Sequence, residues 1–284
     1  MHSSDLTVVG GSIDSNIAGH SGGGVMAISL STVRVCDGAN VSNNTAARSG
    51  GGLLVQGSTL NVSDSGINLN GARSDGGGGV LAEMKSIVTL GDLTSISQNT
   101  ARGNGGGLSL FKSSSLATDG RVSIYGNAAR GGGSIGAGLA AASSCTVRLG
   151  AGAIDLSYNS AASDGGAIAL VKGSSLTDSG DPTRACFLTV RHNTASGNGG
   201  GFAVSGDSSV SLVVSTAVFE RNAAAKQGGG LFIGSALTEF SASQAMEYKV
   251  SRATMWRLDL VDNLAPKGDG GGVRMLMAGT CHLL

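Results

Sequence analysis

The chain is poor in charge, in aromatic residues and in proline. Of its 284 residues, 13% are charged and 4% are aromatic, and only two are prolines. The 19 basic and 19 acidic residues cancel, so no net field draws the chain to nucleic acid or to anionic lipid, and we expect no nucleic-acid partner. Two prolines and no G-X-Y period also exclude collagen.

Signals for secretion, membrane insertion and metal binding are missing as well. The start, MHSSDLTVVGGS, has no basic stretch followed by an apolar run, so no signal peptide is visible. No window approaches about 18 apolar residues, which argues against a transmembrane segment. The four cysteines lie far apart without a CxxC pair, so we interpret them as small buried hydrophobic residues and predict neither metal nor cofactor: Cys36, Cys145, Cys186 and Cys281.

Glycine is abundant, with 49 residues, yet 40% of the chain is hydrophobic. That hydrophobic content is too high for a disordered chain. The composition therefore indicates a folded β protein whose turns are rich in glycine.

A repeat organises almost the whole chain. Nine asparagines are each followed two residues later by alanine and preceded, three residues earlier, by a large apolar residue: Asn16, Asn44, Asn70, Asn99, Asn127, Asn159, Asn193, Asn222 and Asn263. Their spacings are 28, 26, 29, 28, 32, 34, 29 and 41 residues, and glycines follow each one. After Asn127 the stretch GGGSIGAGL has the form of a short insertion. Such periodicity is typical of a solenoid.

Each unit carries three short β signals. In residues 51–72 the alternating pairs are Leu53 with Val55, Leu60 with Val62, and Ile67 with Leu69. Alternation over runs this short predicts half-buried strands separated by turns. We therefore predict an all-β fold, a right-handed single-stranded parallel β-helix of about nine coils, from about residue 7 to 277, with residues 1–284 as one repeat domain. Neither end has an obvious polar cap, so we expect the chain to be a fragment of a larger surface protein.

Glycine and asparagine have structural roles in this interpretation. Glycine supplies positive φ angles where each coil turns sharply. Asparagine tolerates left-handed or bridging angles, and stacked in register its amide can bond to the asparagines above and below. The nine asparagines are thus expected to form a ladder.

The same elements resemble the repeats of chlamydial polymorphic outer membrane proteins. GGAI at 165–168 and FERN at 219–222 match the GGA(I/L/V) and FxxN tetrapeptides of that family, although most units have Ile, Val or Leu for Phe and GGG for GGA. Similar repeats also occur in surface proteins of algae and other protists. The resemblance implies a right-handed β-helix, an extracellular or cell-surface location and a non-enzymatic adhesive role with a glycan or cell-surface partner.

The strongest candidate for a binding site is a basic ridge after the asparagine turn. Six cations fall three or four residues after the repeat asparagine: Arg48, Arg73, Arg102, Arg130, Lys226 and Lys267. Stacked coils would bring the first four together, which is a pattern that suits an acidic glycan. The alternative is that exposed turns carry solubilising charges, partly offset by Asp75 and Asp164.

A second candidate is the outer side of the strand after the glycines, where the expected solvent-facing column is apolar: Met26, Leu54, Leu81, Ser109, Ala140, Ala169, Ala203, Phe232 and Arg274. An exposed apolar stripe can mark a partner surface. The alternative is that a loop covers it, particularly the longer segment at 235–256.

The alternative function is that of a carbohydrate-active enzyme, a polysaccharide lyase or glycoside hydrolase of the pectin-lyase-like β-helix class. Such chemistry needs clustered carboxylates. The nearest pairs are Asp178 with Asp181 and Asp259 with Asp262, and turn chemistry explains each equally well. The four histidines sit singly, so we predict no catalytic residue.

Overall fold

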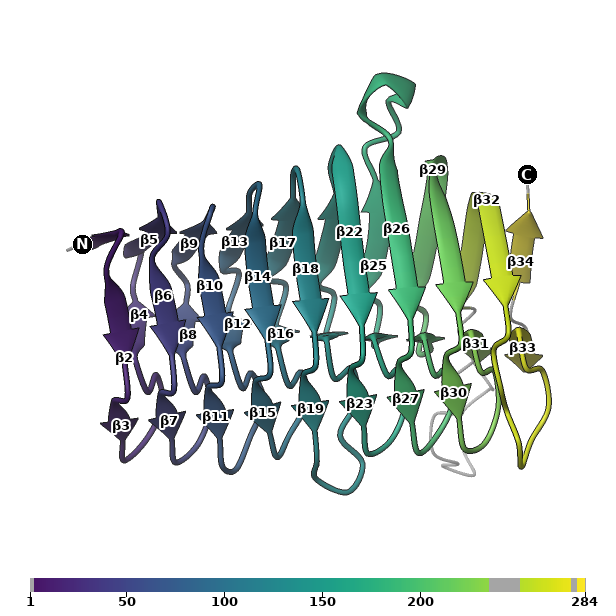
Figure 1. Cartoon of the computed structure of the whole chain (residues 1–284), viewed down its shortest axis with the longest axis horizontal. Helices are drawn as coiled ribbons and strands as arrows, with labels where there is room; N and C mark the ends of the chain where they lie inside the picture. Colours follow the sequence, from purple (N-terminus) through teal and green to yellow (C-terminus); the bar gives the residue numbers. More distant parts are fainter. Residues whose placement is uncertain (1–2, 235–250, 277–279, 284) are drawn as a thin grey trace, which may run out of the picture.

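The chain winds into a rod of stacked coils (Figure 1). The computed structural model describes residues 3–234, 251–276 and 280–283, with side chains up to residue 275. Parallel strands stack as a β-solenoid of about eight turns with almost no helix, in agreement with the predicted right-handed β-helix of roughly nine coils. Within these ranges the one helical element is η1 (Pro182–Arg184), a 3-10 turn that projects from the rod.

The largest sheet of the described residues, sheet A, has 17 strands in two rows. The first row is β1 (Asp5–Val9), β5 (Thr32–Cys36), β9 (Thr59–Val62), β13 (Ile87–Leu90), β17 (Ser115–Thr118), β21 (Thr146–Leu149) and β25 (Ser175–Asp178). The second row is β2 (Ser12–Asp14), β6 (Asn40–Ser42), β10 (Gly66–Asn68), β14 (Thr94–Ser97), β18 (Val122–Tyr125), β22 (Gly152–Ser157) and β26 (Cys186–Arg191). The longer strands β29 (Ser209–Glu220) and β32 (Arg252–Val261) join the two rows, and β34 (Thr280–Leu283) pairs with β32.

Two further sheets complete each coil. Sheet B is a row of two-residue strands: β3 (Ile17–Ala18), β7 (Thr45–Ala46), β11 (Gly71–Ala72), β15 (Thr100–Ala101), β19 (Ala128–Ala129), β23 (Ser160–Ala161), β27 (Thr194–Ala195) and β30 (Ala223–Ala224). Sheet C follows the glycines: β4 (Val25–Ile28), β8 (Leu53–Gln56), β12 (Val80–Glu83), β16 (Leu108–Phe111), β20 (Leu139–Ala142), β24 (Ile168–Val171), β28 (Phe202–Val204), β31 (Leu231–Gly234) and β33 (Val273–Leu276).

The coil over residues 51–72 therefore contains β8, β9, β10 and the short β11, one strand more than the sequence predicts. The alternation with Ile67 predicted Leu69 in a strand, and this is wrong. Leu69 lies between β10 and β11, has φ of 58° and is 52% exposed. Its place in a sharp bend explains why the period-two pattern fails there.

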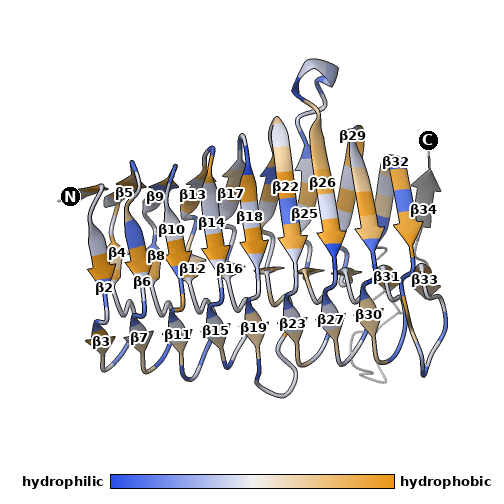
Figure 2. Ribbon diagram, viewed as in Figure 1, coloured by the Kyte–Doolittle hydropathy of each residue, from blue (hydrophilic) through white to orange (hydrophobic). Residues whose placement is uncertain are grey.

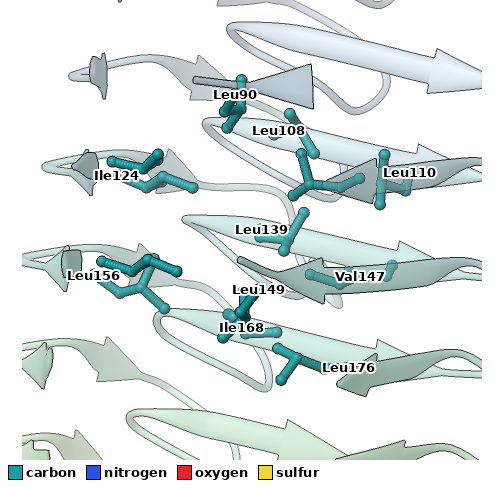
Figure 3. Packing of buried hydrophobic residues seen from close by; sticks show 14 of the residues in the cluster. Leu90, Leu108, Leu110, Ile124, Leu139, Val147, Leu149, Leu156, Ile168 and Leu176 are labelled. Atoms are coloured by element: carbon teal, nitrogen blue, oxygen red, sulfur yellow. The ribbon is translucent and has the colours of Figure 1, made fainter. Parts of the chain in front are cut away.

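The interior of the rod is apolar. The core consists of alternate residues along the strands of sheets A and C. Figure 2 shows that hydrophobic residues recur in these strands coil after coil. Leu108, Leu139 and Ile168 stack from sheet C, and Ile124 and Leu156 from sheet A, all at most 2% exposed (Figure 3). Because a fully buried Leu or Ile contributes roughly 1.5–3 kcal/mol, this continuous column is the main source of stability.

The sequence analysis assigned the left-handed backbone angles at the bend between sheets A and B to the asparagine, and this is wrong. The residue with positive φ is the one before each ladder asparagine, and not the asparagine itself: Ser15, Asn43, Leu69, Gln98, Gly126, Tyr158, His192, Arg221 and Asp262. One residue in the left-handed region turns the chain by itself, and the asparagine that follows is free to point its amide inward.

Each of the three consecutive glycines of a repeat excludes a side chain for a different physical reason. Gly50 has φ of 62°, where a Cβ would be strained. A Cβ on Gly51 would come within 2.5 Å of the backbone of Gly71 in the next coil, and one on Gly52 within 3.0 Å of the Asn70 amide. Close stacking of coils thus excludes side chains at the second and third positions as strongly as the turn does at the first.

The insertion predicted after Asn127 is present as the longer loop over residues 130–138.

Candidate binding surfaces

The nine repeat asparagines form one hydrogen-bonded ladder. From Asn16 to Asn222, each side-chain amide donates to Oδ1 of the asparagine one coil further on, at 2.9–3.0 Å. The second amide hydrogen donates to a carbonyl of the preceding coil, as from Asn99 to Ile67 at 2.8 Å. From Asn44 to Asn222 the asparagines are at most 1% exposed, whereas Asn16 is exposed and Asn263 is half-buried. From Asn44 to Asn222 the ladder is therefore part of the core and offers no polar group to a ligand.

A second ladder, of serines, was missed by the sequence analysis. It lies where sheet C turns into sheet A, and the backbone N–H of Ser58 donates to Oγ of Ser86 at 3.3 Å, and that of Ser86 to Ser114 at 3.1 Å. The buried residues at this position, all at most 5% exposed, are Ser58, Ser86, Ser114, Cys145, Ser174, Ser208 and Ser251. The signal was a serine or cysteine directly before the first β residue of sheet A in each repeat.

Three of the predicted ridge arginines share one column. Arg73, Arg102 and Arg130 directly follow the alanines of β11, β15 and β19, which pair in register. All three arginines are exposed. None of them forms an ion pair with a described residue.

Arg48 does not belong to this column, which corrects the predicted alignment. Ala46 of β7 pairs with Ala72, so the residue equivalent to Arg73 is Ala47, and Arg48 lies one position further. There its carbonyl accepts the N–H of Asp75 at 3.0 Å, and its Nε is 3.9 Å from Asp75 Oδ2. Lys226 is likewise the second residue after its paired alanine. The expected single ridge thus splits into two columns.

The apolar column on the outer side of sheet C is mostly not exposed. Met26 is 54% exposed, but Leu54 is 4%, Ala169 0% and Phe232 8% exposed. The glycine turn before each strand folds back over its outer face, and a Cβ on Gly165 would lie 2.8 Å from Cβ of Ala169. The predicted exposed stripe is therefore wrong over most of its length. The segment 235–256, named as an alternative cover, lies largely outside the described residues.

Where the outer side chains of sheet C are larger, an open groove of about 520 Å³ crosses four coils. Met26, Leu54, Leu81 and Ser109 form its floor. One wall consists of turn residues and the other of the last residues of the strands: Arg48, Asp75 and Asn104 against Gln56, Glu83 and Phe111. With two carboxylates and one arginine that is already paired, these walls do not favour an anionic ligand.

Two of the carboxylates considered for an enzyme, Asp178 and Asp181, are held by hydrogen bonds from backbone N–H groups. Asp178 is 7% exposed, and its oxygens accept the backbone N–H groups of Gly180, Val214 and Ser215 at 2.8–3.2 Å. Asp181 caps η1, and its hydrogen bonds from Thr183 lower the pKa of its carboxyl.

Asp262 of the other aspartate pair and His192, one of the four histidines, also have nearby partners. Asp262 lies 3.6 Å from Nε of Arg221, and Asp259 lies exposed on β32. His192 stacks on Tyr158, with ring centroids 4.9 Å apart. Asp178, Asp181 and Asp262 thus each have a hydrogen-bond or ion-pair partner of their own.

The remaining chemistry-bearing side chains are few. Cys145 and Cys186 are buried as predicted, and burial raises the pKa of both thiols. Cys36 is only half-buried, contrary to the prediction, and Cys281 lies outside the described side chains. Among the residues for which the structure gives a position, no group of three or more His, Cys, Asp or Glu could hold a metal ion. In the same ranges, no helix is long and apolar enough to cross a membrane.

The fold and the surfaces together define the structural class of the protein: it is a parallel β-solenoid with a continuous hydrophobic core and polar outer turns. In comparisons with known proteins, the chain matches no protein-family model, no curated protein and no solved structure. The repeat motifs and the geometry of the outer columns are thus what a functional proposal has to rest on.

Proposed function

We propose that this chain is a non-enzymatic binding scaffold, secreted or displayed at a cell surface, that holds an extended acidic polymer such as an acidic glycan. The observation that carries the proposal is the column of Arg73, Arg102 and Arg130. The location and the adhesive role rest on the resemblance of the GGAI and FERN motifs to surface-protein repeats.

The column has the geometry that an extended polyanion requires. Adjacent coils of a β-solenoid lie about 4.8 Å apart, so the three arginine positions recur at this short and regular interval along the rod. A guanidinium presents several N–H donors in a fixed plane that matches a carboxylate or a sulfate. A polymer lying along the axis can therefore contact all three arginines at once.

The absence of described ion pairs distinguishes these arginines from most others. Arg121, Arg184 and Arg191 lie within 3.1–3.4 Å of a carboxylate oxygen in another coil. A cation that already has such a partner would have to exchange it for a ligand. The column of Arg73, Arg102 and Arg130 has no such partner to lose among the residues that the structure describes.

Binding of heparin, as an acidic polysaccharide, by the triple variant R73S/R102S/R130S tests the proposal. Wild-type affinity should fall steeply with salt, because polyanion binding releases counterions. The triple variant should bind far more weakly, and its log–log slope against salt should be less steep by about 2 to 3, as three lost contacts imply.

The matched control removes three exposed arginines from other faces, R34S/R148S/R257S, which also form no described ion pair. This control should keep most of the affinity, whereas equal losses in both variants would show that only total charge matters. Salt-insensitive binding that survives R73S/R102S/R130S would instead direct attention to the groove over Leu54 and Leu81. Cleavage of a polysaccharide that is lost with D178N would make the chain an enzyme.

A further inference from the structure

A second basic site lies at the other end of the solenoid, in the turns between sheets B and C. Lys226 and Lys267, from neighbouring coils, line an open pocket of about 590 Å³. Asn198, Ala225, Gln227 and Gly268 complete its lining. Both lysines are exposed, and Asn198 and Gln227 are half-buried.

The pocket exists because each of the two coils next to Lys226 places a glycine against it, Gly197 in one and Gly268 in the other. Lys226 N–H donates to the Gly197 carbonyl at 2.9 Å, which places Gly197 directly beside it in the stack. A Cβ on Gly197 would collide with the Asp164 carboxylate, and one on Gly268 with the Lys226 carbonyl. Neither position can carry a side chain, so the space beside the Lys226 side chain stays open.

The lining side chains have one sign of charge. Two ammonium groups and two side-chain amides surround the pocket, and no carboxylate lines it. The two nearby acids already have partners: Asp164 Oδ1 accepts the backbone N–H of the lining residue Asn198 at 2.6 Å, and Asp269 Oδ2 lies 3.7 Å from the guanidinium of Arg274. Lys226 and Lys267 form no ion pair with a described residue.

We propose that this pocket binds an oxyanion, a sulfate or phosphate ester carried on a polar molecule of about monosaccharide size. Lysine ammonium groups bind such anions as point charges, and amide N–H groups add directed hydrogen bonds. The pocket is too large for a bare oxyanion alone, which leaves room for the rest of the molecule beside Ala225 and Gly268. The site is separate from the column of Arg73, Arg102 and Arg130 and does not rest on its function.

A titration followed by two-dimensional NMR of the whole chain tests the proposal. The probes are glucose 6-sulfate, glucose 6-phosphate, inorganic sulfate and glucose. The sugar esters should shift the side-chain NH₂ signals of Asn198 and Gln227 and the backbone signal of Gly268, whereas glucose should leave them unmoved. K226Q/K267Q should weaken binding of the esters by about tenfold or more, because both charge-assisted contacts are lost.

Matched variants separate this site from general charge effects. K85Q/K172Q removes two exposed lysines from the turns between sheets C and A and should bind as the wild type does, as should R73S/R102S/R130S. Unchanged ester binding in K226Q/K267Q, with the ladder asparagine signals in place to show an intact fold, would overturn the proposal. Equal shifts with inorganic sulfate would overturn its second part, the role of the carrier molecule.

Discussion

Truncation of a mid-stack ladder asparagine should be among the most destabilising single changes in this protein. Asn99 is 0% exposed and its side chain takes part in four hydrogen bonds. Its Nδ2 donates to Ile67 O at 2.8 Å and to Asn127 Oδ1 at 3.0 Å. Its Oδ1 accepts the backbone N–H of Asn70 at 2.9 Å and the Asn70 amide at 3.0 Å.

The magnitude follows from the groups that Asn99→Ala leaves without partners. Asn70 loses the acceptor for its backbone N–H and for one amide hydrogen, and the Ile67 carbonyl loses a donor. Asn127 Oδ1 keeps one bond, from the backbone N–H of residue 99 at 3.0 Å. Because each unsatisfied buried group costs about 1–3 kcal/mol and the coils relax in part, we expect a loss of about 3–5 kcal/mol in the free energy of unfolding.

Asn16→Ala is the matched control. Asn16 is exposed, its amide donates only to Asn44 Oδ1 at 2.9 Å, and that oxygen keeps the Asn16 backbone N–H at 3.0 Å. This change should cost less than about 1 kcal/mol. The same loss in both variants, or none in Asn99→Ala, would refute the argument from buried partners.

Urea unfolding followed by circular dichroism measures the total loss. A solenoid of this kind has mainly contacts between neighbouring coils, so it can unfold in parts and the urea transition need not be two-state. Hydrogen exchange supplies the local readout. In Asn99→Ala the backbone N–H of Asn70 should exchange faster, while that of Asn193, several coils away, should be unchanged.

Two further changes test the coil stacking and one of its ion pairs. Gly78→Ala should cost at least about 2 kcal/mol, because the new Cβ would lie 2.6 Å from the Thr100 backbone, whereas Gly132→Ala, with nothing within 4 Å, should stay within about 0.5 kcal/mol in the same urea assay. Asp92 has a lowered pKa because it accepts the Arg121 backbone N–H and lies beside that guanidinium. Since the pKa of Asp92 is lower in the folded than in the unfolded state, its contribution to the free energy of unfolding is present at neutral pH and is lost as the pH falls through the folded pKa. In Asp92→Asn the thermal midpoint should therefore fall less steeply at acid pH than in the wild type. An unchanged acid dependence would contradict this.

Much of the fold was predictable because every coil of a solenoid has the same order of strands and turns, so the same sequence pattern recurs in each repeat. The apolar residue three before the asparagine, such as Ile67 or Ile96, is buried from Val41 to Phe219 and half-buried in the outer coils at Ile13 and Leu260. It points inward because the alternation of the strand and the sharp bend after it recur in every coil. The glycines before sheet C were equally informative, since a turn with positive φ recurs there. In contrast, the serine at the turn into sheet A was lost among the many other serines of the chain, and the two-residue strands of sheet B are too short to give any periodic signal.

The outer surface was less predictable, because exposed positions depend on how the turns align. Arg48 lies four residues after its asparagine and Arg73 three after its own, a difference that looks minor in the sequence. In the structure it moves Arg48 out of the column and beside Asp75. The burial of Ala169 was unpredictable for the same reason, the course of a turn. The glycine turn before its strand covers Ala169, and period-two alternation describes strands but not turns.

The sequence by itself determined the repeat, the parallel β-helix and the inward asparagine ladder, because each follows from contacts between equivalent residues of adjacent coils. Only the tertiary structure decided which cations share a column, which outer side chains are covered and where a pocket opens beside Lys226. Those features depend on one-residue differences in turn length, and such differences change the neighbours of a side chain without changing the repeat that builds the rod.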